Sequence, residues 1–372
     1  MNKTIEPFDA KYMRLAITLA KRGVGKTSPN PAVGCVIVKN NKIVGKGWHK
    51  KAGTAHAEIN ALAMAGEAAK GADLYVTLEP CCHHGATPPC TDALIAAGVR
   101  RVMAGMVDPN PLVAGKGLQI LQKAGIHAAN GLLEADCRKL NPGFIKFVTK
   151  GLPYLTYKTA MSLDGVIAAA TGHSHWVTGD CARKEVHRLR AIYDAVMVGV
   201  NTLLADNPKL TVRHVRGRNP LRIVLDSSLR TPLDAVLLND DAGAETIIAT
   251  LVADQQQHQP YMAKGAKVLV CAEKDGQIDP HDLLIKLADA GVRTILLEGG
   301  GCLAGSLLKT GLIDEFIFFC APKIVGADGY KPFAALGIEK MDQAFHLKIV
   351  EQRMVGQDLM IKALPEAVCL QA

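Results

Sequence analysis

Apolar residues alternate between helical and strand spacing through the first 130 residues of the chain. An opening amphipathic helix is predicted, with Asp9 as its N-cap, Gly23 as its stop and one apolar stripe of Met13, Ala16, Ile17 and Ala20. The elements expected next are strands at 33–38 and 43–47, a helix at 56–69, a strand at 74–78, a helix at 91–97, a strand at 101–107, a helix at 117–124 and a short strand at 126–129. This order is typical of an α/β layer fold.

Glycine and proline interrupt this pattern twice, at 141–143 and at 150–153. Since 372 residues exceed what one core usually supports, we expect two domains, over residues 1–150 and 151–372. The second is also α/β, with strands expected at 154–159, 195–200, 222–226, 246–250, 267–270, 294–297 and 315–320, helices at 180–190, 280–290 and 302–309, and closing strands near the C-terminus.

Composition narrows the class of protein. No apolar run reaches the roughly 18 to 20 residues that cross a bilayer, and the acidic, amphipathic N-terminus is unlike a signal or transit peptide. We therefore expect a cytoplasmic protein with no membrane partner, whose clustered cysteines serve as metal ligands or catalytic groups. The net charge of +8 suits anionic nucleotides and sugar phosphates, but basic residues occur only in short groups such as Lys50-Lys51, so no nucleic-acid partner is expected.

Zinc-binding residue types gather in the first domain as His56-Ala57-Glu58, Glu79-Pro80-Cys81 and Cys90. Hydrolytic deamination needs a hydroxide at neutral pH, which a zinc ion with three protein ligands and one open position supplies. It also needs a carboxylate that takes the proton of the water and delivers it to the ring nitrogen and the leaving ammonia. We therefore expect His56, Cys81 and Cys90 to bind one zinc ion and Glu58 to be the catalytic acid and base.

The predicted elements allow these four side chains to meet. Residues i and i+2 diverge by about 200° on a helix, so His56 and Glu58 converge only at the helix N-terminus. Cys81 leaves a strand and Cys90 precedes a helix, which favours a site at the carboxyl ends of the strands. Cys82, His83 and His84 could also bind zinc, so a closed structural site is an alternative, although such a site would not need the Glu58 carboxylate.

Three segments carry a resemblance to a known family: PNPAVGCVIV, then HAE, then TLEPCCHHGATPPC. They resemble the bifunctional riboflavin-biosynthesis deaminase–reductase of bacteria, in which eight residues separate the two cysteines, whereas nucleobase deaminases that act on nucleic acid carry P-C-x-x-C. The resemblance implies a cytidine-deaminase-like three-layer domain that acts on a diaminopyrimidinone ribosylamine 5′-phosphate. Asn30 and His49 match substrate contacts. The chain departs from the family at Cys82, where serine is usual, and at Ala86, where a basic phosphate-binding residue is expected.

A glycine-rich segment in the second domain, Leu296-Leu297-Glu298-Gly299-Gly300-Gly301, is compatible with a dinucleotide pyrophosphate at a helix N-terminus. Taken alone it could be a simple tight turn. It differs from G-x-G-x-x-G and lies late in the domain, so a Rossmann fold is not expected.

The segments KTAMSLDG, GHSHW, NTLLADNP, LTVR and LLEGGG are similar to the reductase half of the same family. The resemblance implies a dihydrofolate-reductase-like domain in which NADPH reduces the ribosyl chain to ribityl. Positions matching cofactor contacts are Ala160, Trp176, Thr202, Asp206, Ser227, Gly300, Gly301, Cys302, Leu303, Ala304, Gly305 and Ser306. Positions matching substrate contacts are Ser174, Arg190, Leu210, Arg213 and Glu298. A guanidinium binds phosphate in a bidentate manner, which gives Arg190 and Arg213 a physical role.

Three other interpretations remain open on the sequence. An RNA-base deaminase would need base-stacking aromatics and a basic groove, but aromatic residues make up only 5% of the chain. A zinc-stabilised interaction protein would not need Glu58, and Ala86 leaves open a chain that has lost one of its activities. A homo-oligomer, dimer or tetramer, is also expected.

Overall fold

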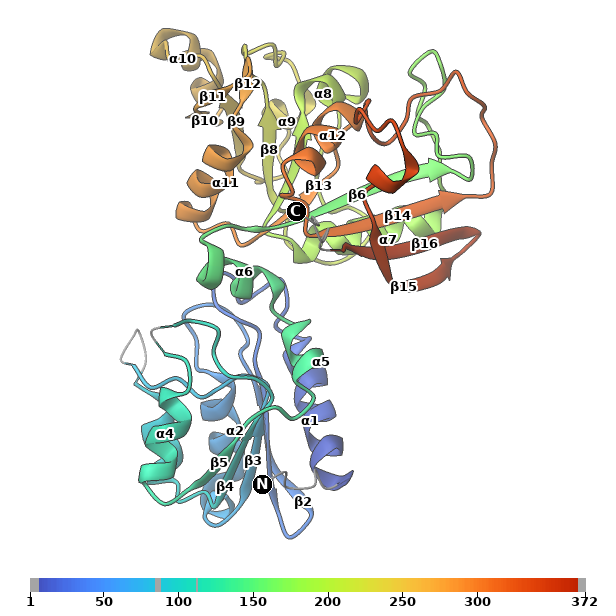
Figure 1. Ribbon diagram of the computed structural model, residues 1–372. Coiled ribbons are helices and arrows are strands. Elements are labelled where there is room, and N and C mark those ends of the chain that lie inside the picture. The colour runs from blue at the N-terminus through green and yellow to red at the C-terminus, as the bar shows by residue number, and fades with distance from the viewer. Residues whose placement is uncertain (1–6, 84–87, 112, 367–372) are drawn as a thin grey trace. The chain divides into compact units, whose positions relative to one another are not determined.

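The computed structural model describes residues 7–83, 88–111 and 113–366 of the chain. His84 and Ala86 therefore lie outside the described residues. The chain folds into two compact units, Met1–Leu152 (blue to green in Figure 1) and Pro153–Ala372 (green to red).

Unit 1 contains a five-stranded sheet in the order β2-β1-β3-β4-β5. Strand β1 runs antiparallel to β2 and β3, whereas β3, β4 and β5 are parallel. The strands are β1 Gly34–Lys39, β2 Lys42–Trp48, β3 Asp73–Val76, β4 Arg101–Ala104 and β5 His127–Ala129. The helices are α1 Pro7–Ala20, α2 Ala57–Ala65, the 3₁₀ helix η1 Gly66–Ala69, α3 Cys90–Ala96, α4 Lys116–Lys123, α5 Glu134–Arg138 and α6 Pro142–Lys150.

Helices α1 and α2 cover opposite faces of this sheet. A Cβ atom on Gly34 would lie 2.0 Å from the carbonyl oxygen of Ala16 in α1, and one on Gly47 would lie 2.2 Å from that of Ala57 in α2. Gly47 pairs with Cys35, the neighbour of Gly34, so the two glycines face opposite sides of the sheet. The result is a three-layer arrangement in which α2 begins directly against β2.

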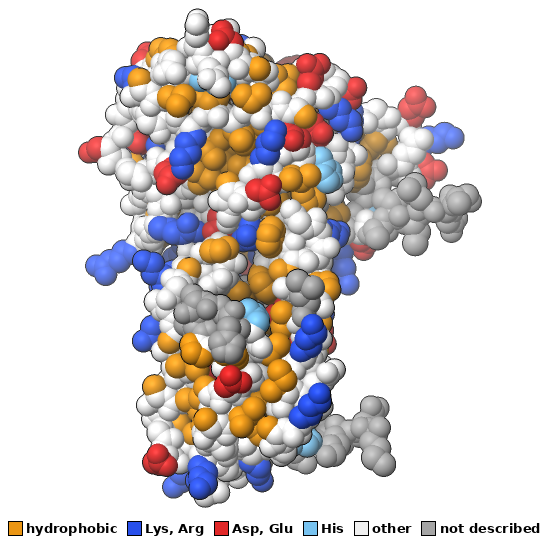
Figure 2. Space-filling view, turned by 90° about the vertical axis from the view of Figure 1, so that its left-hand side faces the viewer, with side chains coloured by type: hydrophobic (Ala, Val, Ile, Leu, Met, Phe, Trp, Pro, Cys, Tyr) orange, Lys and Arg blue, Asp and Glu red, His pale blue; other side chains and the backbone are white. Residues whose placement is uncertain are grey.

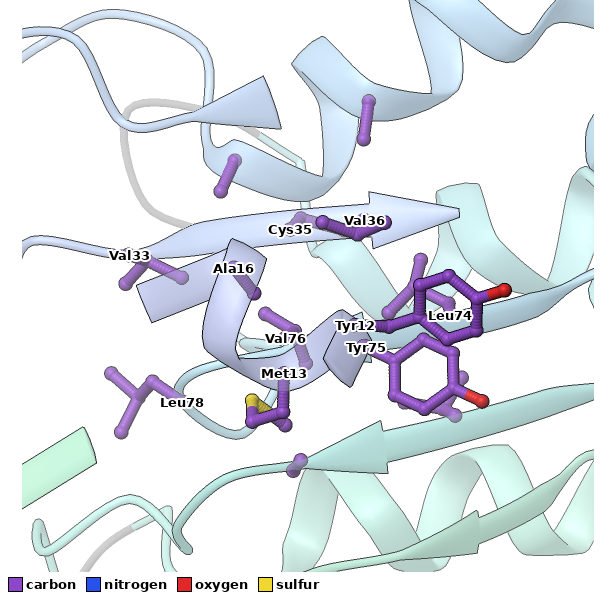
Figure 3. Packing of buried hydrophobic residues seen from close by; sticks show 14 of the residues in the cluster. Tyr12, Met13, Ala16, Val33, Cys35, Val36, Leu74, Tyr75, Val76 and Leu78 are labelled. Carbon is purple, nitrogen blue, oxygen red and sulfur yellow. The ribbon is translucent and has the colours of Figure 1, made fainter. Parts of the chain in front are cut away.

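The core of unit 1 joins the central strands to helices α1, α2, α3 and α4, and Figure 3 shows the part of it near α1. The apolar stripe of α1 is buried as predicted, with Met13, Ala16 and Ala20 fully covered. The rings of Tyr12 and Tyr75 lie side by side with centroids 5.3 Å apart and their hydroxyls pointing the same way.

The prediction that Asp9 caps α1 is wrong, because the helix begins two residues earlier, at Pro7. Its buried carboxylate instead accepts hydrogen bonds from Tyr75 and from Arg101, the latter at 2.7 Å. Asp9 therefore ties the first turn of α1 to β3 and β4.

Unit 2 contains a nine-stranded sheet in the order β10-β9-β8-β7-β13-β6-β14-β16-β15. Its strands from β10 to β14 are parallel, and β16 and β15 add an antiparallel edge. The strands are β6 Tyr154–Ser162, β7 Ala195–Gly199, β8 Leu221–Leu225, β9 Thr246–Thr250, β10 Lys267–Val270, β13 Thr294–Leu297, β14 Glu315–Ala321, β15 Leu347–Val355 and β16 Asp358–Pro365, with a separate hairpin of β11 Glu273–Lys274 and β12 Gln277–Ile278. Strands such as β7, buried on both faces, read as continuous apolar runs.

The helices of unit 2 are α7 Asp180–Ile192, α8 Val200–Asp206, α9 Val236–Asn239, α10 Gln255–Ala263, α11 Pro280–Asp289, α12 Gly301–Lys309 and the 3₁₀ helix η2 Met341–Gln343. The hydrophobic pattern missed α8, α9 and α10. Helix α10 consists largely of polar residues and contains Pro260, but the Asp254 carboxylate accepts a hydrogen bond from the Gln256 amide at 2.9 Å and so caps its first turn.

Within the described residues, no helix is long and apolar enough to cross a membrane. On the face drawn in Figure 2, Lys and Arg side chains are scattered among hydrophobic and acidic ones and form no continuous basic band.

Candidate active sites

Three metal-ligating side chains meet in unit 1. The ligand atoms of His56, Cys81 and Cys90 all lie within 4.8 Å of one another, and His56 Nδ1 is 3.3 Å from the Cys90 sulfur and 3.5 Å from the Cys81 sulfur. One imidazole and two thiolates form a donor set that zinc accepts, and three protein ligands leave a tetrahedral ion one position for water. The residues present therefore fit a catalytic rather than a closed zinc site.

Local backbone conformation sets this geometry. His56 is the N-cap of α2 with extended φ and ψ of −67° and 167°, and Glu58 lies in the first turn. The extended backbone at His56 removes the divergence that a continuous helix would impose. Cys90 is the first residue of α3, and its amide donates a hydrogen bond to the Cys81 sulfur over 3.3 Å. The carboxyl end of β3 and the start of α3 therefore converge where the sequence predicted.

Glu58 is only 3% exposed and lies against the metal ligands. Burial, which disfavours the charged carboxylate, raises its pKa to about 7, and the nearby Cys81 thiolate adds to the effect. A carboxyl group with this pKa gains and loses a proton near neutral pH, as an acid and base in deamination must do.

The two cysteines form a coupled pair. The hydrogen bond from the Cys90 thiol lowers the pKa of Cys81 to about 4, whereas donating that bond, together with burial, raises the pKa of Cys90. Cys81 is thus held as a thiolate, and Cys90 gives up its proton when a metal replaces the hydrogen bond.

His49 extends the site beyond the metal ligands. Its ring lies 5.4 Å from that of His56, its Nδ1 is 3.3 Å from the Pro31 carbonyl oxygen, and its buried Nε2 has no hydrogen-bond partner among the described residues. An unpartnered buried nitrogen is costly unless a ligand satisfies it. Asn30, adjacent to Pro31, is exposed. Among the described residues, Cys82 and His83 do not join the metal cluster.

Glu79 was not predicted to have a role, although it belongs to the Glu79-Pro80-Cys81 segment. Its carboxylate is 4% exposed and accepts hydrogen bonds from the amides of Asp108, Gly115 and Leu118 at 3.0, 2.9 and 3.2 Å. These bonds hold Glu79 in place, two residues before the Cys81 ligand. A carboxylate directly after a buried strand was the signal that could have identified it.

Unit 2 contains a cavity of about 1270 Å³ along the carboxyl ends of its parallel strands. This exceeds the 300 to 1,000 Å³ of a typical small-molecule site, so a dinucleotide and a second ligand fit together. Of the predicted contacts, the cavity is lined by Ala160, Ser174, Trp176, Arg190, Thr202, Asp206, Leu210, Arg213, Ser227, Glu298, Gly300, Gly301, Cys302, Leu303 and Ser306.

Ala304 and Gly305 do not line this cavity. Ala304 is fully buried, and Gly305 packs toward Ala334 and Leu336. The preceding turn is open: the Gly300 amide donates to Thr202 Oγ1 over 3.3 Å, and a nine-residue helix begins at Gly301. Such an N-terminus suits a pyrophosphate.

Glu298 organises the charged wall of the cavity. It accepts two hydrogen bonds from Arg190, at 2.7 and 3.0 Å, and pairs with Lys158 at 2.9 Å. Burial alone would raise the pKa of Glu298, but these two cations hold it far below its usual range. Lys158 was not predicted as a site residue, because a single lysine in strand β6 reads as solvent-facing. Arg213, beside this cluster, donates to Thr211 Oγ1 over 3.1 Å.

The fold and the ligand cluster of unit 1 define a zinc-binding deaminase domain. Residues 7–106 match the family model of the cytidine and deoxycytidylate deaminase zinc-binding region, and residues 153–361 match that of the RibD C-terminal domain.

Comparison with whole proteins covers nearly the full chain. The riboflavin biosynthesis protein RibD of Actinobacillus pleuropneumoniae is 47% identical over 95% of this chain and 94% of its own length, and that of Escherichia coli (strain K12) is 45% identical over 94% and 98%. The structure of Acinetobacter baumannii RibD superposes with a TM-score of 0.88 at 41% identity, covering 97% of this chain and 99% of that chain. The Thermotoga maritima diaminohydroxyphosphoribosylaminopyrimidine deaminase/5-amino-6-(5-phosphoribosylamino)uracil reductase gives 0.85 at 34% identity, covering 96% and 99%.

The chain belongs to the RibD family. It is a bifunctional enzyme of riboflavin biosynthesis that joins a zinc-dependent deaminase to an NADPH-dependent reductase and acts on a small pyrimidine substrate. The predicted fold, a cytidine-deaminase-like domain followed by a dihydrofolate-reductase-like domain, is confirmed.

Proposed function

We propose that residues 1–150 remove the 2-amino group of a diaminopyrimidinone ribosylamine 5′-phosphate and that residues 151–372 then reduce the ribosyl chain of the product to ribityl. The observation that carries the proposal is the convergence of His56, Cys81 and Cys90 beside the buried Glu58 carboxylate. The large cavity in unit 2 supports the second step.

In the first step, His56, Cys81 and Cys90 would hold a zinc ion, which would supply a water molecule of lowered pKa. Glu58 takes one proton from the attacking water and delivers it to the ring nitrogen. It then takes the second proton from the hydroxyl on the attacked carbon and delivers it to the amino group, which leaves as ammonia while the carbonyl forms. The free Nε2 of His49 and the side chain of Asn30 hold the pyrimidine.

In the second step, the cavity of unit 2 would hold NADPH, which would supply the hydride that reduces the C1 carbon of the ring-opened sugar. The cofactor contacts are Ala160, Trp176, Thr202, Asp206, Ser227 and the 300–306 segment without Ala304 and Gly305. Ser174, Leu210 and Glu298 position the substrate, and Arg190 and Arg213 bind its phosphate. Arg213 carries more of this task, because three of the five N–H donors of Arg190 are engaged with Glu298 and the Thr211 carbonyl.

The test is a coupled assay of Glu58→Gln. We expect ammonia release to fall by about 10²- to 10⁴-fold, while one zinc stays bound and supplied deaminated product is reduced at the native rate. Ammonia release at the native rate would refute the role of Glu58, and loss of zinc would make Glu58 a ligand instead.

We also propose that the enzyme forms a homo-oligomer, a dimer or tetramer, in the cytoplasm, where reducing conditions keep the zinc-binding thiols free. The oligomer is supported by the edge strand β15, on which Ile349, Val350 and Met354 are about half exposed. Light scattering should give a multiple of 39.6 kDa, and Met354→Lys should lower the mass whereas Ile285→Lys on α11 should not. A native mass of 39.6 kDa would contradict this.

A further inference from the structure

One arginine of the cavity in unit 2 has no role in the proposed function. Arg230 lines the cavity after the carboxyl end of β8 and is exposed to it. Its Nη2 donates a hydrogen bond to Asn201 Oδ1 over 2.9 Å. The residue after Asn201 is Thr202, whose hydroxyl accepts a hydrogen bond from the Gly300 amide. A short series of contacts therefore joins Arg230 to the glycine turn.

Most other cations of the cavity pair with carboxylates. Lys158, in the middle of β6, and Arg190, near the end of α7, share the carboxylate of Glu298, which directly follows β13. Arg183 pairs with Asp180 at the start of α7. Lys158 and Arg183 are therefore held by carboxylates, and Arg190, which binds the substrate phosphate in the proposed function, keeps two of its N–H donors on Glu298.

The remaining basic chains also lie away from β8. Arg213 is close enough to Glu298 for its pKa to respond to that charge, and Lys331 donates to the carbonyl oxygen of Asp164 in the loop after β6. Arg230 makes no ion pair within the described part of the chain. The adjacent Asp226 is buried, and its carboxylate accepts bonds from the Thr231 amide and hydroxyl at 2.6 and 2.7 Å.

Sheet order relates this free cation to the glycine turn. Strands β13, β7 and β8 are consecutive neighbours, so about 10 Å separates the end of β13 from that of β8. A dinucleotide with its pyrophosphate at the 299–301 turn and its nicotinamide toward Ala160 and Trp176 extends its adenosine half across β7 toward β8. Ser227 and Ser228 line the cavity there, beside Arg230.

We propose that Arg230, with the hydroxyls of Ser227 and Ser228, binds the 2′-phosphate of NADPH and sets the preference of the reductase for NADPH over NADH. A guanidinium and two hydroxyls supply the donors that a phosphate dianion accepts, and Asn201 holds the guanidinium in place. The inference rests on the proposed location of NADPH in this cavity.

The test compares two nucleotide fragments that differ at the 2′ position. Calorimetry with the whole enzyme should show adenosine 2′,5′-bisphosphate binding about ten- to a hundredfold more tightly than AMP, as expected for charge-assisted hydrogen bonds. Arg230→Ala should abolish this difference by weakening the bisphosphate alone, and Arg230→Lys should retain part of it. The kcat/KM of reduction should fall with NADPH and stay unchanged with NADH.

Arg188→Ala is the matched control, since Arg188 is an exposed arginine of the same unit that does not line the cavity. It should leave the affinities of both fragments unchanged. If the native enzyme prefers the bisphosphate and Arg230→Ala keeps that preference, or if both fragments weaken equally, Arg230 is not the 2′-phosphate ligand. If the native enzyme binds neither fragment, the location of NADPH in this cavity fails, and this inference fails with it.

Discussion

The two candidate sites are built in opposite ways. The metal cluster of unit 1 is small and largely buried, and its side chains come from two short segments, 56–58 and 79–90. The cavity of unit 2 is large and open, and its walls come from strands, helices and loops spread between residues 158 and 334. The first site is encoded by local motifs, whereas the second exists only because a parallel sheet brings the ends of distant strands to one edge.

Removing zinc should have the largest effect and should separate the two sites completely. A chelator should abolish ammonia release, because without the metal the pKa of the attacking water returns toward its value in bulk, and should leave the reduction of supplied deaminated product unchanged. Activity is measured for each step separately, and added zinc should restore the first. A parallel fall in reduction would mean that the two units do not function independently.

Glu298→Ala should have the next largest effect, confined to unit 2. The change leaves Lys158 and Arg190 buried without their carboxylate, and breaking such a cluster typically costs about 3 to 5 kcal/mol. Urea unfolding followed by tryptophan fluorescence can monitor each unit, because Trp48 lies in unit 1 and Trp176 in unit 2. Glu298→Gln should lose less, and a shift in the Trp48 transition would contradict the prediction.

Glu79→Gln should weaken zinc binding by about 10- to 100-fold, as expected for a group that orients a ligand. The amide that replaces the carboxylate cannot accept all three backbone bonds equally well. Competition with a colorimetric chelator measures the affinity. Glu134→Gln, at an exposed position of the same unit, should bind zinc as the native enzyme does.

The smallest expected effect is on how the stability of unit 2 depends on pH. His187 is buried, and its Nδ1 accepts a hydrogen bond from the Arg213 backbone amide over 3.2 Å. Burial, with repulsion from Arg190, Arg213 and His214, lowers its pKa to about 4. The folded protein thus binds this proton less readily than the unfolded chain, so its contribution to stability is complete above pH 6.5 and is lost as pH falls toward 4. In His187→Gln, the free energy of unfolding of unit 2, measured by urea unfolding, should change less between pH 6.5 and 4 than in the native enzyme. An unchanged pH dependence would mean that other groups cause it.

The sequence predicted the metal cluster of unit 1 more completely than the cavity of unit 2, because local motifs encode the first and tertiary structure assembles the second. The strands at 246–250, 267–270 and 294–297 were predicted with the bounds that the structure has. The first and third are largely buried parallel strands, which are continuous apolar runs in the sequence. The HAE and EPC segments, with Cys90 nine residues after Cys81, specify the metal cluster within two short stretches of chain. Arg230 and Lys158 gave no such signal, because an arginine in a turn and a lysine in a strand acquire meaning only when tertiary structure directs them into a cavity.

The sheet order of unit 2 also bears on how the chain folds as it is synthesised. Strand β6 comes first in this unit, yet its neighbours β13 and β14 follow about 130 and 150 residues later. At 5 to 20 residues per second, both edges of β6 wait on the order of ten seconds for a partner on the ribosome. Unit 1, whose strands all lie within 152 residues, can be complete by then. The deaminase half should therefore resist protease on stalled ribosomes well before the reductase half does.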